Sequence, residues 1–149
     1  DTMADHMPTE KWVRYLREQF PTMWHVPIAF ITGQTGRNVK ALINHAQMLF
    51  KQSRSRVTTG ELNRLMEAAI QRNPPPLFRQ RRPKVFYCTQ VGVQPPTIVM
   101  FVNDPKAFPH TYKRYLLGVL RDQLEFGEVP IKLYLQTRKQ TDQSEAKGA

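Results

Sequence analysis

The first 56 residues contain two amphipathic segments with a wholly apolar segment between them. Over residues 8–20 the apolar positions recur three and four residues apart, which predicts a helix with one buried face that ends at Pro21. Residues 26–32 (VPIAFIT) are typical of a strand covered on both faces in a parallel sheet. Residues 33–36 predict a tight turn, and residues 37–51 predict a second amphipathic helix. This order of helix, buried strand, turn and helix is that of the end of an α/β domain.

A third helix is predicted over residues 57–73. Thr58 and Glu61 have the spacing of a capping box, in which each side chain bonds the other's backbone N–H at a helix start. Apolar residues then recur at helical intervals until Asn73 and the proline run at 74–76. The residue before a proline is biased away from helical geometry, so we expect the helix to end there.

Three strands and a fourth helix are predicted after the prolines. Residues 85–91 alternate in polarity and residues 97–102 are continuously apolar, so we expect two strands joined by a loop at 92–96. A helix is predicted from Pro109 to Gly127, and residues 131–135 alternate as a final strand. The order α-β-β-α-β predicts an α+β domain with a three-stranded sheet, helices on one face and the other face free for a partner.

These patterns divide the chain into three parts. We expect residues 1–56 to be the remnant of a larger α/β domain, residues 57–137 to be a self-sufficient domain, and residues 138–149 to be a disordered polar tail. The boundary falls in the polar, basic stretch at 51–57. The strand at 26–32 has no neighbouring strands in the first part to satisfy its backbone. We therefore expect this part to expose apolar surface or to pair with another chain.

The charge of the chain points to an anionic partner. Its 149 residues carry 22 Lys and Arg against 12 Asp and Glu, a formal net charge of +10. Residues 57–139 hold thirteen basic and six acidic residues, so most of the excess lies in the second part. Such an excess favours nucleic acid as a partner, although many solvated protein faces are also basic.

The remaining composition favours a cytoplasmic protein without a metal centre or a catalytic cysteine. No apolar run approaches the roughly 20 residues that span a bilayer, and the lone Cys88 excludes an internal disulfide. Cys88 lies within a predicted strand, which favours a small buried hydrophobic role. The four histidines are scattered and show no metal-binding or nucleophile spacing with Cys88; they are His6, His25, His45 and His110.

Two groups of basic residues are candidate partner contacts. Arg79, Arg81, Arg82 and Lys84 lie close in sequence to Phe78 and Phe86, a combination suited to phosphate contact with aromatic support. A solvated connector, or a face that docks on another protein domain, explains the same residues. Lys113 and Arg114 lie on the polar side of the helix at 109–127, and Tyr112 and Tyr115 of that helix are interpreted as core residues.

The second part resembles the C-terminal domain of the EngA/Der family of bacterial GTPases. The resemblance is carried by TTGELNRLMEAAIQRNPPP, RRPKVFYCTQVGVQPPTIVMFVNDP, YKRYL and VPIKLYL, in this order over about residues 57–137. It implies a KH-like fold. It also implies a parent protein with two consecutive GTP-binding domains that acts in assembly of the large ribosomal subunit, with ribosomal RNA and the first GTP-binding domain as partners.

The first part resembles the end of the second GTP-binding domain in that family. Residues 31–36 (ITGQTG) are similar to the family's guanine-contacting loop. Thr32, Gly33 and Gln34 stand at the Ser, Ala and Lys/Leu positions of that loop. The resemblance implies that Thr32 supplies a hydroxyl that steadies the loop and that Gly33 supplies a backbone N–H to the guanine oxygen. The fold class implied for the whole chain is a partial P-loop GTPase domain, a helix-strand-helix remnant, followed by the KH-like domain. The start at Asp1 favours a fragment of a longer protein.

The chain contains none of the motifs that hydrolyse GTP. A Gly-x-x-x-x-Gly-Lys-Ser/Thr phosphate loop, an Asp-x-x-Gly motif and an Asn-Lys-x-Asp motif are all missing from the sequence. Phosphoryl transfer needs the amides and lysine of that loop and a Mg²⁺ ligand. We therefore expect no catalytic residue, metal or cofactor in this chain, and GTP or GDP with Mg²⁺ in the parent protein.

Three hypotheses for function follow. The first is an output module whose basic surface binds ribosomal RNA according to the nucleotide state of the parent. The second is a docking domain that binds and regulates the first GTP-binding domain, with RNA contact incidental. The third is a freestanding small RNA-binding protein, against which the unpartnered strand at 26–32 argues. Separately, Gly33-Gln34-Thr35-Gly36 imitates the Gly-x-x-Gly loop of true KH domains. That loop joins two helices in KH domains, whereas here it follows a predicted strand.

Overall fold

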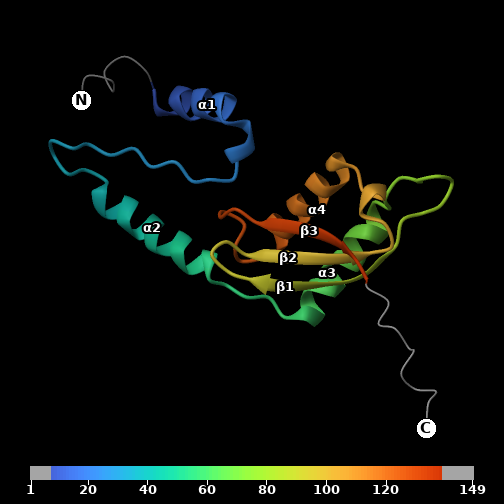
Figure 1. The fold of residues 1–149 in the computed structure, drawn as a ribbon. Coiled ribbons are helices and arrows are strands. Elements are labelled where there is room, and N and C mark those ends of the chain that lie inside the picture. Colours follow the sequence, from blue (N-terminus) through green and yellow to red (C-terminus); the bar gives the residue numbers. More distant parts are fainter. Residues whose placement is uncertain (1–7, 139–149) are drawn as a thin grey trace, which may run out of the picture.

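The computed structural model describes residues 8–138, so His6 and all of the predicted tail except Arg138 lie outside the described residues. Figure 1 shows the elements along the chain. Three helices come first, with a short 3₁₀ turn after the first of them: α1 (Thr9–Gln19), η1 (Pro21–Met23), α2 (Val39–Ser53) and α3 (Thr59–Arg72). The strands β1 (Val85–Gly92) and β2 (Thr97–Val102) follow, then η2 (Pro105–Ala107), α4 (His110–Gln123) and β3 (Lys132–Thr137).

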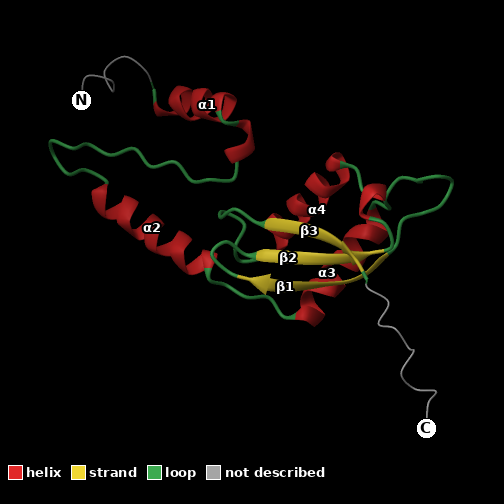
Figure 2. Ribbon diagram, in the orientation of Figure 1, coloured by secondary structure: helices red, strands yellow, loops and turns green. Residues whose placement is uncertain are grey.

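The three strands form one mixed sheet in the order β1-β2-β3. β1 is antiparallel to β2, and β3 is parallel to β2. Helices α3 and α4 cover one face of this sheet, and no described element covers the other face (Figure 2). The α-β-β-α-β order and the two-layer arrangement that the sequence predicts are confirmed.

The hydrophobic core lies between the sheet and the helices α3 and α4. Its fully buried side chains come from both layers: Leu62, Met66, Ile98, Met100, Val102, Leu116 and Leu120. Tyr112 and Tyr115 of α4 belong to this core as predicted. Their hydroxyls donate to the backbone oxygens of Asn73 and Ala69 at 2.8 and 2.9 Å, which connects α4 to the last turns of α3.

The edge strand β1 is capped by a side chain of α3. The amide of Asn63 accepts a hydrogen bond from the backbone N–H of Cys88 and donates one to its carbonyl oxygen, each 2.8 Å long. An edge strand otherwise presents unpaired backbone groups that recruit other chains. Cys88 itself is fully buried, and this burial raises the pKa of its thiol to about 12, which confirms its role as a small hydrophobic residue.

The prediction that Gly127 ends the helix α4 is wrong. The helix ends at Gln123, and Gly127 lies in the turn before β3. A Cβ atom at this position would overlap the backbone oxygen of Arg121. The guanidinium of Arg121 in turn donates to the carbonyl oxygens of Gly127 and Val129 at 3.0 and 2.8 Å. Glycine is therefore needed here for a close backbone approach.

The strand predicted at 26–32 does not form. The segment is extended, and within residues 8–138 it belongs to no sheet. Local hydrogen bonds hold it, from the N–H of Val26 to the oxygen of Met23, from the N–H of Thr32 to the oxygen of Arg37, and from the side-chain amide of Asn38 to the oxygen of Phe30 at 3.1 Å. A β-strand needs a neighbour to satisfy its backbone groups. Among residues 8–138 the sheet is built from β1, β2 and β3 alone, so the segment has no such neighbour there.

Apolar side chains in this first part remain exposed, as expected. Neither α1 nor α2 contains a buried residue. The exposed large apolar residues before the sheet domain are Tyr15, Phe20, Met23, Trp24, Phe30, Ile31, Leu42, Ile43, Met48 and Phe50. In Figure 1 the helix α2 extends away from the sheet as a single rod.

The end of α2 is fixed to the sheet domain by hydrogen bonds that we call the joint. The helix runs to Ser53, two residues beyond its predicted end. The amide of Gln52 donates to the Glu128 carboxylate at 2.8 Å, and the N–H of Gln94 donates to the oxygen of Ser53 at 2.8 Å. The connector that follows is polar, as predicted, but these bonds anchor its start.

The side chain of Gln90 completes the joint. It accepts a hydrogen bond from the N–H of Val57 at 2.9 Å and donates to the oxygens of Ser55 and Gly92 at 3.0 and 3.1 Å. Helix α3 begins directly after this anchor, with the hydroxyl of Thr58 accepting from the N–H of Glu61 at 3.2 Å. Only this half of the predicted capping box is observed, because the Glu61 side chain makes no bond to the Thr58 N–H among the described residues. The two parts of the chain are therefore connected by specific contacts.

No helix between residues 8 and 138 is both long and apolar enough to cross a membrane.

Candidate nucleic-acid interface

The basic residues before β1 lie on a tight two-residue turn. Phe78 and Arg81 pair through two backbone hydrogen bonds, from each N–H to the other's oxygen, 2.8 and 3.0 Å long. The prolines at 74–76 end α3, and Pro83 follows the turn, so the chain cannot continue as a helix through this segment. The turn therefore projects from the end of the sheet domain (Figure 1).

The backbone of this turn is strained. Arg79 and Gln80 have φ angles of 49° and 63°, the left-handed pair that a type I′ turn requires. Asn-Gly sequences usually fill these positions, because a side chain costs about 1–2 kcal/mol in the left-handed region. Arg79 lies against the Phe78 ring, with 5.2 Å between its guanidinium carbon and the ring centroid. The strain is typical of segments with a binding role.

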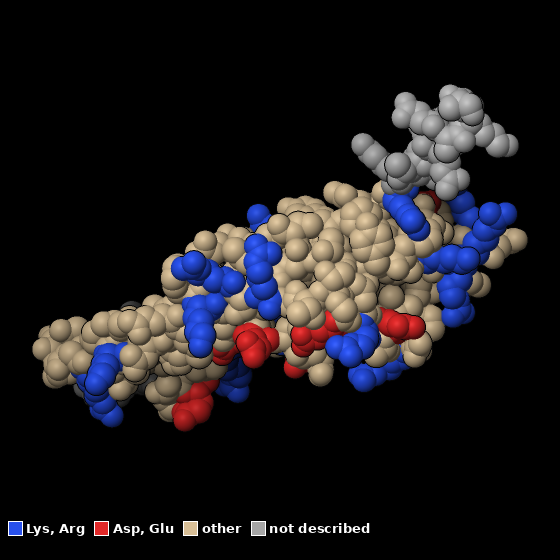
Figure 3. Space-filling model, turned by 90° about the horizontal axis from the view of Figure 1, so that it is seen from below, with Lys and Arg blue, Asp and Glu red and all other residues tan. Residues whose placement is uncertain are grey.

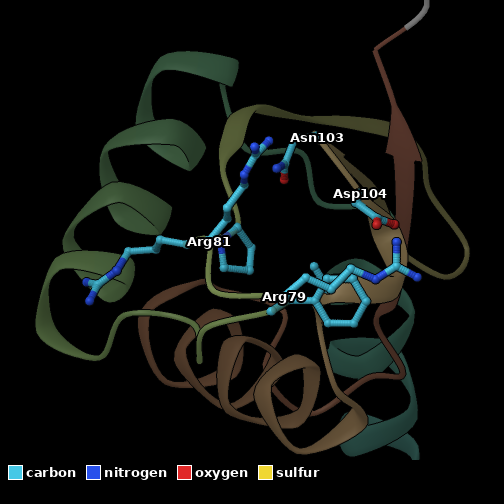
Figure 4. A pocket seen from close by; sticks show the side chains of 8 residues that line it. Arg79, Arg81, Asn103 and Asp104 are labelled. Atoms are coloured by element: carbon cyan, nitrogen blue, oxygen red, sulfur yellow. The ribbon is translucent and has the colours of Figure 1, made fainter.

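The turn borders a pocket of about 190 Å³. Its lining comes from the turn and from the segment after β2 that leads into η2: Phe78, Arg79, Arg81, Arg82, Pro83, Asn103, Asp104 and Ala107. Asn103 holds Lys84 in place, because its side-chain oxygen accepts from the Lys84 N–H at 2.9 Å and its own N–H donates to the Lys84 oxygen at 3.1 Å. Figure 4 shows the side chain of Arg79 reaching toward Asp104.

The arrangement suits contact with phosphate groups. Arg79, Arg81, Arg82 and Lys84 are all exposed. Figure 3 shows Lys and Arg side chains gathered at the right-hand end of the molecule, the end at which this turn lies in Figure 1. A guanidinium group can donate two parallel hydrogen bonds to one phosphate. The four residues that the sequence analysis selected are thus brought together at one end of the domain.

The second candidate pair is not part of this pocket. Lys113 and Arg114 lie in the first half of α4, and neither lines the pocket at the turn. Arg114 is exposed, whereas Lys113 is half-buried. Contact of this pair with a partner stays a prediction.

The candidate guanine loop lies at the opposite end of the molecule (Figure 1). The N–H of Thr32 donates to the Arg37 oxygen at 3.1 Å, and the N–H of Gly36 donates to the Thr32 oxygen at 2.9 Å, which closes the turn. Gly36 has a φ of 68°, so this position needs glycine. Gly33 and Gln34 are exposed. The loop joins an extended segment to α2, whereas the Gly-x-x-Gly loop of a KH domain joins two helices.

The aromatic side chains on the open face of the sheet were not predicted from the sequence. Tyr87, Phe101 and Tyr134 occupy outward positions of β1, β2 and β3. The alternation of side chains along each strand was available as a signal, because Cys88, Met100 and Leu135 form the facing inward row. The joint was also missed, since its partners are far apart in sequence.

Comparison with known proteins gives a consistent result. Residues 56–136 match the family described as "KH-domain-like of EngA bacterial GTPase enzymes, C-terminal". GTPase Der of Rhodopirellula baltica is 60% identical over 142 residues, which cover 95% of this chain and 31% of that protein. GTPase Der of Natranaerobius thermophilus is 37% identical over 124 residues, covering 83% of this chain and 28% of that protein. The chain therefore spans less than a third of the length of these relatives.

Proposed function

Since the chain belongs to the EngA/Der family of bacterial GTPases, we propose that it serves as the C-terminal, RNA-binding part of a GTPase that assembles the large ribosomal subunit. The observation that carries this proposal is the basic turn. Four cationic side chains are exposed at one end of the KH-like domain, and three of them line the pocket beside a turn whose backbone is strained at Arg79 and Gln80. Ribosomal RNA in the cytoplasm is the partner that this surface fits.

GTP hydrolysis belongs to other domains of such a protein. These 149 residues contain no phosphate-loop sequence, so no step of phosphoryl transfer is derived from them. GTP or GDP and Mg²⁺ would bind the GTP-binding domains. From this chain, Thr32, Gly33 and Gln34 would contribute a loop hydroxyl and a backbone N–H next to the guanine base.

The joint gives the KH-like domain a means of following the GTP-binding domain that precedes it. α2 is the last helix before the KH-like domain, and Gln52, Ser53 and Ser55 are bonded to that domain. A rigid attachment transmits a displacement of α2 to the basic turn, whereas a flexible linker would absorb it. This supports a role as an output module.

The salt dependence of RNA binding tests this proposal. The 149-residue chain should bind large-subunit ribosomal RNA with an affinity that falls steeply with salt, with a log–log slope of about −0.7 for each phosphate contact on single strands. Arg81→Gln combined with Arg82→Gln should flatten this slope by about 1.4. Arg14→Gln on the exposed side of α1 is the control and should change the slope little. A flat slope for the wild-type chain would contradict the proposal.

A second candidate function is docking onto the first GTP-binding domain. Leu77 is 65% exposed beside the arginines, and an apolar side chain at a basic surface suits a protein partner. Titration of the chain with an isolated GTP-binding domain of a GTPase Der separates the two. Docking would be favoured if the wild-type chain bound this domain tightly at one-to-one stoichiometry but did not bind RNA, and if Arg81→Gln and Arg82→Gln abolished the binding to the domain.

A further inference from the structure

The open face of the sheet carries two rows of side chains across its three strands. One row runs from Tyr87 to Phe101 to Gln136, and the next row runs from Thr89 to Val99 to Tyr134. No helix among residues 8–138 lies over these rows, because α3 and α4 pack against the opposite face (Figures 1 and 2). The face is therefore open to a partner.

Three of the six residues in these rows are aromatic. Tyr87 and Phe101 stack on each other with 4.4 Å between ring centroids and 18° between ring planes. Tyr87 is 40% exposed and lies in the edge strand β1. One face of its ring stacks on Phe101, and no strand lies beside the other face. Tyr134 is 51% exposed, next to Val99, which is 6% exposed. Exposed aromatic side chains grouped on one open face make that face a candidate binding surface.

The charge at the borders of this face is positive. None of the three strands contains an aspartate or a glutamate. Lys132 lies at one end of the face, opposite Thr97. Lys84 and Arg138 lie at the other end, on either side of Asn103, where the sheet continues into the basic turn. The acidic residue at this end, Asp104, has its carboxylate bonded to the N–H of Lys106 at 2.9 Å.

We infer that the open sheet face binds a single-stranded RNA segment by stacking its bases on Tyr134 and on the Tyr87–Phe101 pair. Exposed aromatic faces bordered by cations and free of carboxylates are the combination by which proteins hold single strands without sequence preference. Lys132, Lys84 and Arg138 would contact the phosphates on either side. This inference rests on the proposed function and extends the RNA surface from the basic turn across the sheet.

A matched set of tyrosine variants tests the stacking. The probe is a ten-nucleotide oligoadenylate, and an abasic ribose-phosphate oligomer of equal length is the comparison. The wild-type chain should bind the probe more tightly than the abasic oligomer. Tyr134→Leu should lower the affinity for the probe about tenfold at constant salt slope. Tyr134→Phe keeps a ring and should retain the affinity. Tyr15→Leu is the control, because Tyr15 is 48% exposed in α1, away from the sheet.

The outcomes separate the stacking from the wider proposal. Equal affinity for the probe and the abasic oligomer, or a Tyr134→Leu variant that binds like the wild type, would overturn the stacking. If large-subunit RNA were still bound with a steep salt slope in that case, the basic turn would remain the RNA contact. Failure of the wild-type chain to bind any RNA would overturn both. If Tyr134→Leu lost binding to an isolated GTP-binding domain while its RNA binding stayed unchanged, the open face would be a protein-docking surface instead.

Discussion

The two parts of this chain have similar apolar patterns but very different burial. Residues 57–137 bury a common core between one sheet and the helices α3 and α4, with side chains such as Leu62, Met100 and Leu116 fully enclosed. Residues 8–53 contain two amphipathic helices and an apolar extended run, yet neither helix has a buried residue. Amphipathic patterning predicts which elements form, but their burial depends on whether the chain supplies the layer they pack against.

The largest expected difference is in the free energy of unfolding when the same substitution, leucine to alanine, is made in each of the two parts. Leu116→Ala removes a fully buried side chain of α4 and should lower the free energy of unfolding by about 2–5 kcal/mol. Leu42→Ala in α2, at a position that is 38% exposed, should change it by about 0.5 kcal/mol or less. Denaturant unfolding of both variants measures the difference. A similar loss at both positions would show that the first part has a core of its own.

A glycine pair sharpens the same comparison at the level of packing. Gly127→Ala would force the turn away from Arg121 and should cost about 1–3 kcal/mol. Gly33→Ala meets no atom within 4 Å and should be nearly neutral. Thermal unfolding of the two variants provides the measurement. A neutral Gly127→Ala would mean that the turn before β3 is not closely packed.

The joint between the parts predicts a smaller effect. Gln90→Leu removes the acceptor for the N–H of Val57 and should destabilise the chain by about 1 kcal/mol. The end of α2 should also become more mobile, because Ser55 and Val57 lose their partner. Hydrogen exchange at the Val57 amide is the readout, with Gln71→Leu on the exposed side of α3 as the control. Unchanged exchange at Val57 would argue against a fixed joint.

The smallest expected effect concerns the titration of His25. Burial, Arg121 and Arg17 lower the pKa of His25 below its usual 6.5, and both ring nitrogens lack a hydrogen-bond partner among the described residues. As the pH falls, the imidazole of His25 is therefore protonated in the unfolded chain before it is protonated in the folded chain. The free energy of unfolding should then fall slightly as the pH drops from 6.5 toward the folded-state pKa. His25→Gln should remove this dependence, whereas His45→Gln should keep it. An NMR titration midpoint for His25 above 6.5 would contradict the assignment.

Local signals were sufficient to predict the KH-like part. The capping residue Thr58, the prolines at 74–76 and the alternation along each strand depend on near neighbours in sequence, and the elements they predict are observed. The run at 26–32 is apolar and extended as predicted. A hydrogen-bonded β-ladder also requires neighbouring strands, and the pattern of apolar residues in one segment does not show whether such strands are present. The role of Gly127 depends on a backbone contact with Arg121 that no sequence pattern shows.

The candidate site was predictable in composition and unpredictable in geometry. Arg79, Arg81, Arg82 and Lys84 were selected because charge is read directly from the sequence. Their turn was not foreseen, because Arg79 and Gln80 lack the Asn-Gly signal of a type I′ turn. Asn103 belongs to the site through its contact with Lys84, 19 residues away along the chain.

Amide hydrogen exchange of the 149-residue chain tests the contrast between the two parts most directly. The account predicts that the backbone amides of β2, at the centre of the sheet, exchange only on global unfolding. It also predicts that the amides between Val26 and Thr32 exchange at the rate of an unstructured peptide, since that segment has no ladder partner within the described residues. Protection of residues 26–32 comparable to that of β2 would show a paired strand in a closed fold, and would contradict the account.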